Sequence, residues 1–351
     1  MRYRVFGRTG LRVSQAALGT ATFGTAWGWG CTPEEAQVVF ERFVDAGGNF
    51  FDCADGYQNG QSETILGDLI AHDRDNFIVS TKYTTAVGMQ SIAKTGNSRK
   101  AMMASIEGSL KRLKTDFVDI YWVHMPDLVT STDEIVRGLE DLVRSGKTRY
   151  IGMSDFPAWK VARALTQAEI RGTEPLAAIQ VEHSLAARTV EREFFPLAQA
   201  YGLAIMAWSP LGGGTLSGKY RDKNIKGRVN QGGGPVRQIP EESREAIVAA
   251  LDEVAAATGA TPAQVALAWV VAKEPLGTAM IPVFGARTVE QLDQNLAAFE
   301  LKLSPGQVAT LDRASAVPLG FPYEIMNDPA MRALHTGGHW DLLDEPVLPR
   351  P

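Results

Sequence analysis

Four residues that could move a proton lie at or just after the ends of apolar, strand-like runs in the first part of the chain. Asp52 and Tyr57 follow one such run, Lys82 ends a second, and His124 ends a third. A carboxylate keeps a neighbouring lysine charged, and the ammonium can lower the pKa of a nearby phenol from its ordinary value of about 10. A histidine can hydrogen-bond a substrate oxygen or share the proton. The set predicts protonation of a carbonyl oxygen while a hydride reaches its carbon, or the reverse reaction on an alcohol.

Apolar, β-prone runs alternate with longer helical patterns along the chain. Strands are predicted at residues 16–19, 49–53, 77–82, 117–124, 149–154, 178–181, 204–208 and 279–283. Helices are predicted at residues 32–44, 98–114, 132–144, 157–170, 189–201 and 261–272. This α/β alternation predicts right-handed βαβ units and a closed (β/α)8 TIM barrel. The carboxyl ends of the strands in such a barrel share one face, so the four residues should meet there.

Three further segments shape the expected domain. The run 5–13 predicts an N-terminal β-hairpin that closes the barrel floor, and the Gly-rich stretch 219–240 predicts a long mobile loop. No G-x-G-x-x-G motif follows the first strand, which weakens the alternative of an open dinucleotide-binding sheet. We therefore expect one domain over residues 1–351, with an extended C-terminal segment, 318–351, whose aromatic residues favour packing near the barrel mouth.

Composition narrows the class of protein. The formal net charge is -5 over 351 residues, so no basic field favours nucleic acid or an anionic membrane surface. The chain has neither an apolar leader nor a run of about 18 apolar residues, so a cytoplasmic protein is expected. Its two cysteines, Cys31 and Cys53, predict neither a disulfide framework nor a metal site. The expected partner is a small molecule, and the oligomeric state is left open.

The motif blocks resemble one known family. The run 52–57, DCADGY, followed by Ser-Glu at 62–63 and Leu-Gly at 66–67, resembles the aldo-keto reductase signature. Lys82 after Ile-Val-Ser-Thr and His124 after Asp-Ile-Tyr-Trp-Val match the next two blocks, and the likeness runs from Phe6 to about Leu311. The resemblance implies a TIM barrel and an NADPH-dependent carbonyl reductase, an oxidoreductase with Tyr57 as general acid/base beside Asp52, Lys82 and His124.

The same resemblance implies a site for NADPH or NADP. Ser154 and Gln180 would hold the nicotinamide carboxamide, and Trp208 would stack on its ring. Residues 209–214, Ser-Pro-Leu-Gly-Gly-Gly, would approach the pyrophosphate, and Arg287 suits the adenosine 2′-phosphate. The full implied set is Gly19, Thr20, Ser154, Gln180, Trp208, Ser209, Leu211, Gly213, Lys219, Gly285, Arg287, Gln291 and Asn295. Asp155 departs from the asparagine usual in the family, and an ionised aspartate only accepts hydrogen bonds.

Aromatic and apolar residues near the expected mouth are candidates to contact the substrate. They are Trp27, Trp29, Tyr83, Met125 and Phe321. A pocket of this kind would accept an aldehyde, a ketone, a sugar or a secondary alcohol, and the sequence does not rank them. Two other functions stay open: an NADPH-binding regulatory barrel without turnover, and a lyase or isomerase that uses Lys82 as a Schiff base.

Overall fold

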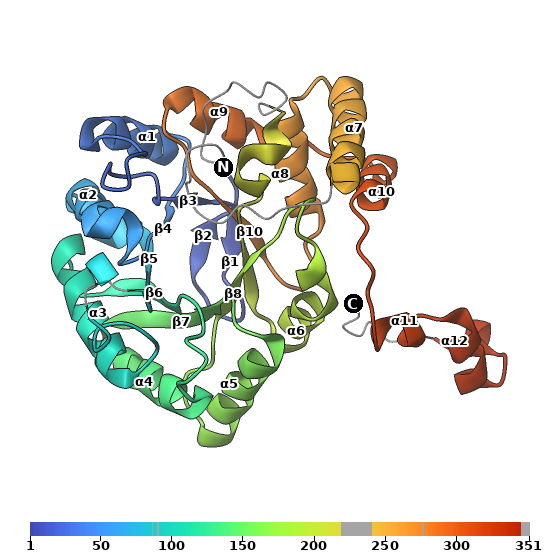
Figure 1. Cartoon of the computed structure of the whole chain (residues 1–351), viewed down its shortest axis with the longest axis horizontal. Coiled ribbons are helices and arrows are strands. Elements are labelled where there is room, and N and C mark those ends of the chain that lie inside the picture. The colour runs from blue at the N-terminus through green and yellow to red at the C-terminus, as the bar shows by residue number, and fades with distance from the viewer. Residues whose placement is uncertain (86, 90, 219–240, 276, 345–351) are drawn as a thin grey trace.

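Eight parallel strands close into a barrel in the computed structural model, which describes residues 1–85, 87–89, 91–218, 241–275 and 277–344 (Figure 1). Around the barrel the strand order is β10-β3-β4-β5-β6-β7-β8-β9. The strands are β3 (Ala17–Gly19), β4 (Phe50–Asp52), β5 (Ile78–Tyr83), β6 (Val118–Val123), β7 (Thr148–Ser154), β8 (Ala178–Glu182), β9 (Ala204–Trp208) and β10 (Met280–Phe284). These confirm the predicted TIM barrel, and each strand lies within one residue of its predicted bounds.

Helices surround the barrel, and their buried apolar residues pack against the strands or against neighbouring helices (Figure 1). They are α1 (Pro33–Asp45), α2 (Gln61–Ile70), α3 (Arg99–Leu113), α4 (Thr132–Arg144), α5 (Ala158–Arg171), α6 (Phe194–Tyr201), α7 (Glu241–Thr258), α8 (Pro262–Ala272), α9 (Val289–Ala297) and α10 (Pro305–Ala314). Helix α1 begins after a capping box in which Thr32 and Glu35 satisfy each other's backbone N–H groups. Helix α6 starts later than predicted, because residues Thr189–Arg192 form a separate 3₁₀ turn.

The N-terminal hairpin plugs the amino end of the barrel. Its strands, β1 (Tyr3–Val5) and β2 (Arg12–Ser14), pair antiparallel, as predicted. Phe6 and Val13 are fully buried and join the apolar cluster inside the barrel. The Phe6 ring meets Phe50 edge-to-face at 5.9 Å between ring centroids. The hairpin therefore closes the end of the barrel opposite the carboxyl ends of the strands.

Alternation of side chains along each strand decides which residues reach the barrel interior. On β5, for example, Ile78 belongs to the interior cluster, whereas Val79 packs on the helices outside. The large Trp122 ring occupies the interior where β7 carries Gly152, and a Cβ at that glycine would lie 2.2 Å from the indole. By the same alternation, the side chains of Asp52 and Lys82, near the carboxyl ends of β4 and β5, point into the opening at that end of the barrel.

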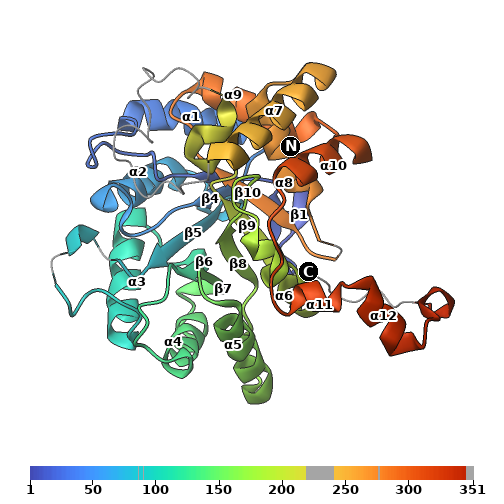
Figure 2. The same ribbon diagram turned by 45° about the vertical axis from the view of Figure 1, so that its right-hand side comes forward.

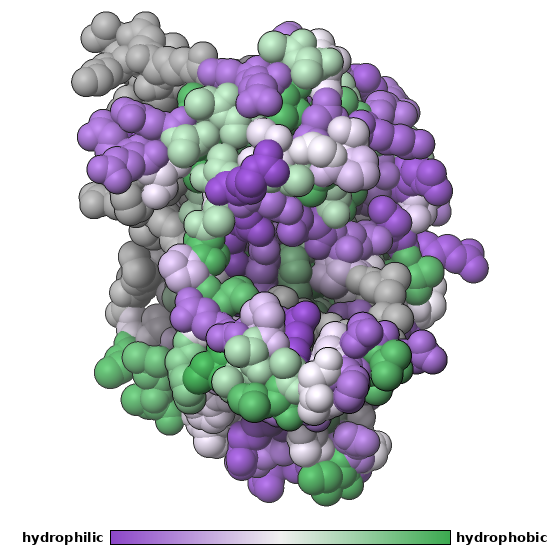
Figure 3. All heavy atoms as spheres, turned by 90° about the vertical axis from the view of Figure 1, so that its right-hand side faces the viewer, coloured by the Kyte–Doolittle hydropathy of each residue, from purple (hydrophilic) through white to green (hydrophobic). Residues whose placement is uncertain are grey.

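The C-terminal segment leaves the barrel instead of covering its mouth. The short helices α11 (Tyr323–Met326) and α12 (Pro329–Thr336) project to one side in two views (Figures 1 and 2). Phe321 is 84% exposed and Leu334 is 71% exposed. Figure 3 faces the side from which this segment projects, and apolar side chains reach the surface there. The expected packing of this segment near the mouth is therefore not seen for residues 318–344. The stretch 219–240, predicted as a long loop, lies outside the described residues.

No single helix in the described ranges is long and apolar enough to cross a membrane; α7 and α8 meet the length and composition test only as a pair bent by 96°.

We expect Phe6→Ala to lower the free energy of unfolding by about 3–5 kcal/mol, because it empties a buried aromatic site at the barrel floor. Urea denaturation followed by far-UV circular dichroism measures the change. Val5→Ala is the matched control on the same hairpin, since Val5 is 55% exposed. Equal losses of unfolding free energy in the two variants would contradict the role of the hairpin in closing the barrel.

Candidate active site

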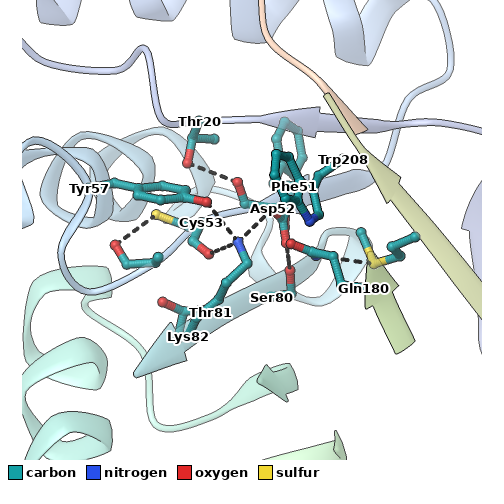
Figure 4. A network of polar contacts seen from close by, with 12 residues as sticks. Thr20, Phe51, Asp52, Cys53, Tyr57, Ser80, Thr81, Lys82, Gln180 and Trp208 are labelled. Atoms are coloured by element: carbon teal, nitrogen blue, oxygen red, sulfur yellow. Dashed lines mark hydrogen bonds and ion pairs between the residues drawn. The ribbon is translucent and has the colours of Figure 1, made fainter. Parts of the chain in front are cut away.

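The Lys82 side chain is fully buried, and its ammonium has an oxygen partner for each of its three N–H groups (Figure 4). Nζ donates to Asp52 Oδ2 at 2.6 Å and to the Cys53 carbonyl at 2.7 Å. The third donor lies 3.2 Å from the Tyr57 hydroxyl oxygen. Strands β4 and β5 are paired neighbours, so their ends bring these groups together from distant parts of the sequence. The predicted Asp52–Lys82–Tyr57 cluster is present.

The Asp52 carboxylate is held on its other side as well. Its Oδ1 accepts hydrogen bonds from Ser80 Oγ at 2.8 Å and from Gln180 Nε2 at 3.0 Å. Ser80 lies two residues before Lys82 on β5, so the two side chains share one face of the strand. Gln180 reaches across from β8, on a different side of the barrel. The Lys82–Asp52 pair is thus fixed by donors from two strands.

The charges in this cluster keep Lys82 protonated. Burial is the largest single influence and opposes the charged form of the lysine, but the Asp52 carboxylate and the Tyr57 phenol together outweigh it and raise the pKa of the ammonium above its usual value. A protonated amine has no lone pair with which to attack a carbonyl carbon. This geometry speaks against the Schiff-base alternative, because the lysine serves as a fixed hydrogen-bond donor and positive charge.

The phenol of Tyr57 is also protonated at neutral pH. Burial raises its pKa above the usual value, and the Lys82 ammonium opposes the rise without cancelling it. The sequence predicted a lowered pKa on the strength of the lysine alone. The direction of the lysine's effect is confirmed, but the net shift is upward because the phenol loses hydration in its surroundings.

His124 completes the cluster on the far side of the phenol. Its ring and the Tyr57 ring meet at 76° with centroids 5.9 Å apart. Burial, with the Lys82 charge adding to it, lowers the pKa of the imidazole to about 3, so the ring is neutral at neutral pH. Its Nδ1 atom is buried and has no hydrogen-bond partner within the described part of the chain. A neutral imidazole can donate one hydrogen bond to a substrate oxygen.

The turn that carries Tyr57 is tied to the loop after β3. Gln58, directly after Tyr57, is fully buried and has a left-handed backbone with φ of 48°. Its Oε1 accepts from the Trp27 backbone N–H at 2.9 Å, and its Nε2 donates to the Trp29 carbonyl at 3.0 Å. Sequence analysis missed this anchor; only its position next to Tyr57 could have drawn attention to it.

One of the predicted substrate residues, Trp27, lies beside the phenol, a second, Trp29, packs against Trp27, and a third, Met125, lies near the end of β6. The Trp27 ring lies 6.1 Å from the Tyr57 ring and 5.4 Å from the Trp29 ring, measured between centroids. Trp27 is 38% exposed and Met125, just after His124, is 37% exposed, so both retain surface for a ligand. Trp27 and Trp29, tilted by 46° to each other, thus form an apolar aromatic pair whose Trp27 ring meets the phenol edge-to-face.

The other two predicted substrate residues, Tyr83 and Phe321, lie elsewhere. Tyr83 is fully buried and stacks on Tyr121 at 5.5 Å between ring centroids, in the layer between strands and helices. It directly follows the inward-facing Lys82, so strand alternation turns it outward. Phe321 belongs to the segment that projects from the barrel, and its 84% exposure leaves it without contact to the mouth.

The three predicted nicotinamide residues lie on neighbouring strands, two of them at the last position and Gln180 at the middle of β8. Ser154 on β7 pairs in register with Gln180 on β8, and Trp208 ends β9. Trp208 is half-buried, and its indole N–H donates to Asp155 Oδ1 at 3.0 Å. Asp155 has a left-handed backbone, with φ of 55°. An indole face can stack on a flat ring, and the nicotinamide role of these three residues stays a prediction.

The Gly-rich segment after β9 forms a tight 3₁₀ turn, η5 (Gly212–Ser217). Gly213 and Gly214 have φ of 66° and 97°, a conformation that side chains rarely adopt. Here the Gly213 N–H donates to Ser209 Oγ at 3.0 Å, and the Gly214 N–H donates to the Leu211 carbonyl at 2.9 Å. The pyrophosphate role of this loop stays a prediction, and Lys219 lies outside the described residues.

Three other predicted cofactor residues, Gly19, Thr20 and Gly285, lie where β3 and β10 end. A Cβ on Gly285 would come 3.4 Å from the Gly19 carbonyl oxygen, so the chain passes closely there. Thr20 is buried, and its hydroxyl donates to the Asp52 carbonyl oxygen at 3.2 Å. Thr20 therefore links the ends of β3 and β4 from the protein interior.

Arg287 follows β10, and its backbone N–H donates to Gln291 Oε1 at 3.0 Å. Within the described residues its guanidinium makes no hydrogen bond or ion pair, which leaves it free for a phosphate. Asn295, on the following helix α9, is buried.

Comparison with known proteins agrees with this geometry. The model of the aldo/keto reductase family matches residues 16–316, which span the barrel and the cluster around Lys82. The chain belongs to the aldo/keto reductase family. This assignment confirms the resemblance drawn from the motif blocks.

Curated aldo/keto reductase relatives cover most of the chain. A protein named norsolorinic acid reductase from Aspergillus flavus is 34% identical over 93% of this chain and 84% of its own length. A putative aryl-alcohol dehydrogenase of Saccharomyces cerevisiae is 34% identical over 93% of this chain and 90% of its own. An aryl-alcohol dehydrogenase [NADP(+)] of Phanerodontia chrysosporium is 33% identical over 95% and 91%. The chain is thus an oxidoreductase of this family.

We expect Asp52→Asn to lower the free energy of unfolding at pH 7 by about 3–5 kcal/mol, because Lys82 becomes a buried charge without its counterion. Burial then lowers the pKa of Lys82 in the folded state, so raising the pH from 7 to 9 should recover stability in the variant relative to wild type. Urea denaturation at both pH values measures this.

The matched control for that variant is Asp68→Asn, which removes a carboxylate that pairs with Lys114 on the surface. Its expected loss is below about 1 kcal/mol. A loss in Asp52→Asn that is equally small, or that does not shrink at higher pH, would contradict a charge-compensated Lys82.

Proposed function

We propose that this protein is an NADP(H)-dependent oxidoreductase that reduces an aldehyde or ketone to the alcohol, and runs in reverse on a secondary alcohol, with Tyr57 as general acid/base. The observation that carries the proposal is the 3.2 Å contact between the Lys82 ammonium and the Tyr57 hydroxyl oxygen, beside a neutral His124. NADP(H), when bound, supplies or accepts the hydride.

The residues divide the proton chemistry among them. In the reduction direction the Tyr57 hydroxyl donates its proton to the carbonyl oxygen, and the nearby Lys82 ammonium stabilises the phenolate that remains. His124 donates a hydrogen bond to the same substrate oxygen and so orients the carbonyl. Asp52 keeps the lysine charged and aimed through the 2.6 Å ion pair. In the oxidation direction the phenolate takes the alcohol proton.

The neighbourhood of the phenol supports aryl carbonyls and aryl alcohols as the substrate class. The Trp27 indole lies beside Tyr57, Trp29 packs against Trp27, and Trp27 retains exposed surface. Planar rings gain from stacking on such indoles beyond their apolar burial. The printed names of the relatives, aryl-alcohol dehydrogenase among them, support the same class.

Tyr57→Phe should lower turnover by roughly 10²–10⁴-fold, because it removes the proton donor. NADPH binding should stay near the wild-type value. The measurement is the loss of absorbance at 340 nm with NADPH and paired aryl and alkyl aldehydes of similar size, next to a calorimetric titration of NADPH. Tyr150→Phe is the control, because it removes a phenolic hydroxyl from the amino-terminal half of β7, away from the carboxyl end of that strand.

Near-normal turnover in Tyr57→Phe would reject the assignment of the general acid. NADPH binding by the wild type with no turnover on any carbonyl or alcohol would favour the non-catalytic regulatory barrel. Faster reduction of alkyl than of aryl aldehydes would reject the proposed substrate class alone.

Arg287→Ala should weaken NADPH binding by roughly 10–100-fold, because a charge-assisted hydrogen bond to the 2′-phosphate is lost. NADH lacks that phosphate, so its binding should change little. Calorimetric titration of both cofactors into wild type and variant measures the effect. Equal weakening for the two cofactors would remove the proposed phosphate role.

A further inference from the structure

Asp155 connects two strand ends at the proposed nicotinamide site. It follows the last residue of β7, and its backbone N–H donates to the Gln180 carbonyl on β8 at 3.1 Å. Its carboxylate accepts the Trp208 indole N–H, from the end of β9, at 3.0 Å. The carboxylate therefore lies at the edge of the indole that is the candidate stacking surface.

The charge of this carboxylate is not neutralised by its hydrogen-bond partner, because an indole N–H is a neutral donor. The cation that acts on Asp155 is Lys82, whose ammonium is already engaged by Asp52. Glu182, at the end of β8, adds a second carboxylate and disfavours ionisation. Burial among these groups raises the pKa of Asp155 to about 6, so the side chain carries a negative charge above neutral pH.

A negative charge at this position distinguishes the two redox forms of a nicotinamide cofactor. The oxidised ring carries a positive charge, and the reduced ring carries none. A carboxylate near the ring therefore attracts only the oxidised form, and the attraction is stronger in a partly enclosed site than in water.

We propose that Asp155 makes this site bind the oxidised cofactor more tightly, relative to the reduced cofactor, than an uncharged residue would. The inference rests on the proposed function, because it places the nicotinamide against Trp208. This preference affects the direction of the reaction. A site that favours the oxidised form binds the cofactor that alcohol oxidation needs, and it releases oxidised cofactor slowly after carbonyl reduction.

The decisive variant is Asp155→Asn. Asparagine has the same shape, still accepts the Trp208 N–H, and tolerates the left-handed backbone at this position, so the fold should be kept. At pH 8 the ratio of the NADP dissociation constant to the NADPH dissociation constant should rise by about tenfold in the variant. Calorimetric titration of each form into the whole protein measures the ratio without turnover.

The pH dependence is a second readout of the same charge. Protonation of Asp155 removes the attraction, so the wild-type ratio should rise as the pH falls from 8 to 5, with its midpoint near the pKa of about 6. The variant has no group to protonate at this position, so its ratio should stay flat. Below the midpoint the two proteins should converge.

Asp68→Asn changes the net charge by the same amount on the exposed face of α2 and should leave the ratio unaltered. A ratio that Asp155→Asn leaves unchanged, with both forms still bound, would overturn this inference and spare the proposed function. An equal change in Asp68→Asn would also overturn it. A wild-type protein that binds neither form would overturn both.

Discussion

The buried Lys82 ammonium is the constraint from which the geometry of the active site follows. A charge with no exposed surface needs compensation, because an unpaired ion in the interior is unfavourable by several kcal/mol. Here the carboxylate of Asp52, a backbone carbonyl and the Tyr57 phenol provide it. The position of the phenol is thus set by the need to satisfy a cation as much as by apolar packing, and every group that fixes Asp52 also fixes the tyrosine indirectly.

The barrel extends this network from one side of its opening to the other. Gln180 donates to the same carboxylate from β8, and its neighbour in register, Ser154, lies where the proposed nicotinamide residues gather. A change at Gln180 can therefore reach the Tyr57 hydroxyl through the Asp52 carboxylate and the Lys82 ammonium. Such a short path needs no moving part, only strands whose ends are held rigidly in register.

Much of this arrangement follows from the sequence because parallel strands bury both faces and leave clear apolar runs. The strand ends, and with them Asp52, Lys82 and His124, could be placed from those runs. Tyr83 could not be placed correctly, because a shift of one residue along a strand moves a side chain to the opposite face, and an apolar run does not reveal the exact register. The prediction for Phe321 was wrong for another reason. The path of a segment beyond the last helix depends on contacts that no local pattern encodes. The pKa of Tyr57 required knowledge of burial, which composition does not give.

Gln58 has a consequence for how substrate preference can change over evolutionary time. Gln58, the residue next to Tyr57, holds the backbone at Trp27 and Trp29, so the loop that carries the two indoles and the turn that carries the phenol share one support. A mutation that reshapes the loop to admit a new substrate therefore also perturbs Tyr57, the proposed proton donor. Changes in substrate selectivity that are made through the loop backbone therefore also change the reaction rate. Side-chain substitutions that preserve the loop backbone change selectivity without changing the rate.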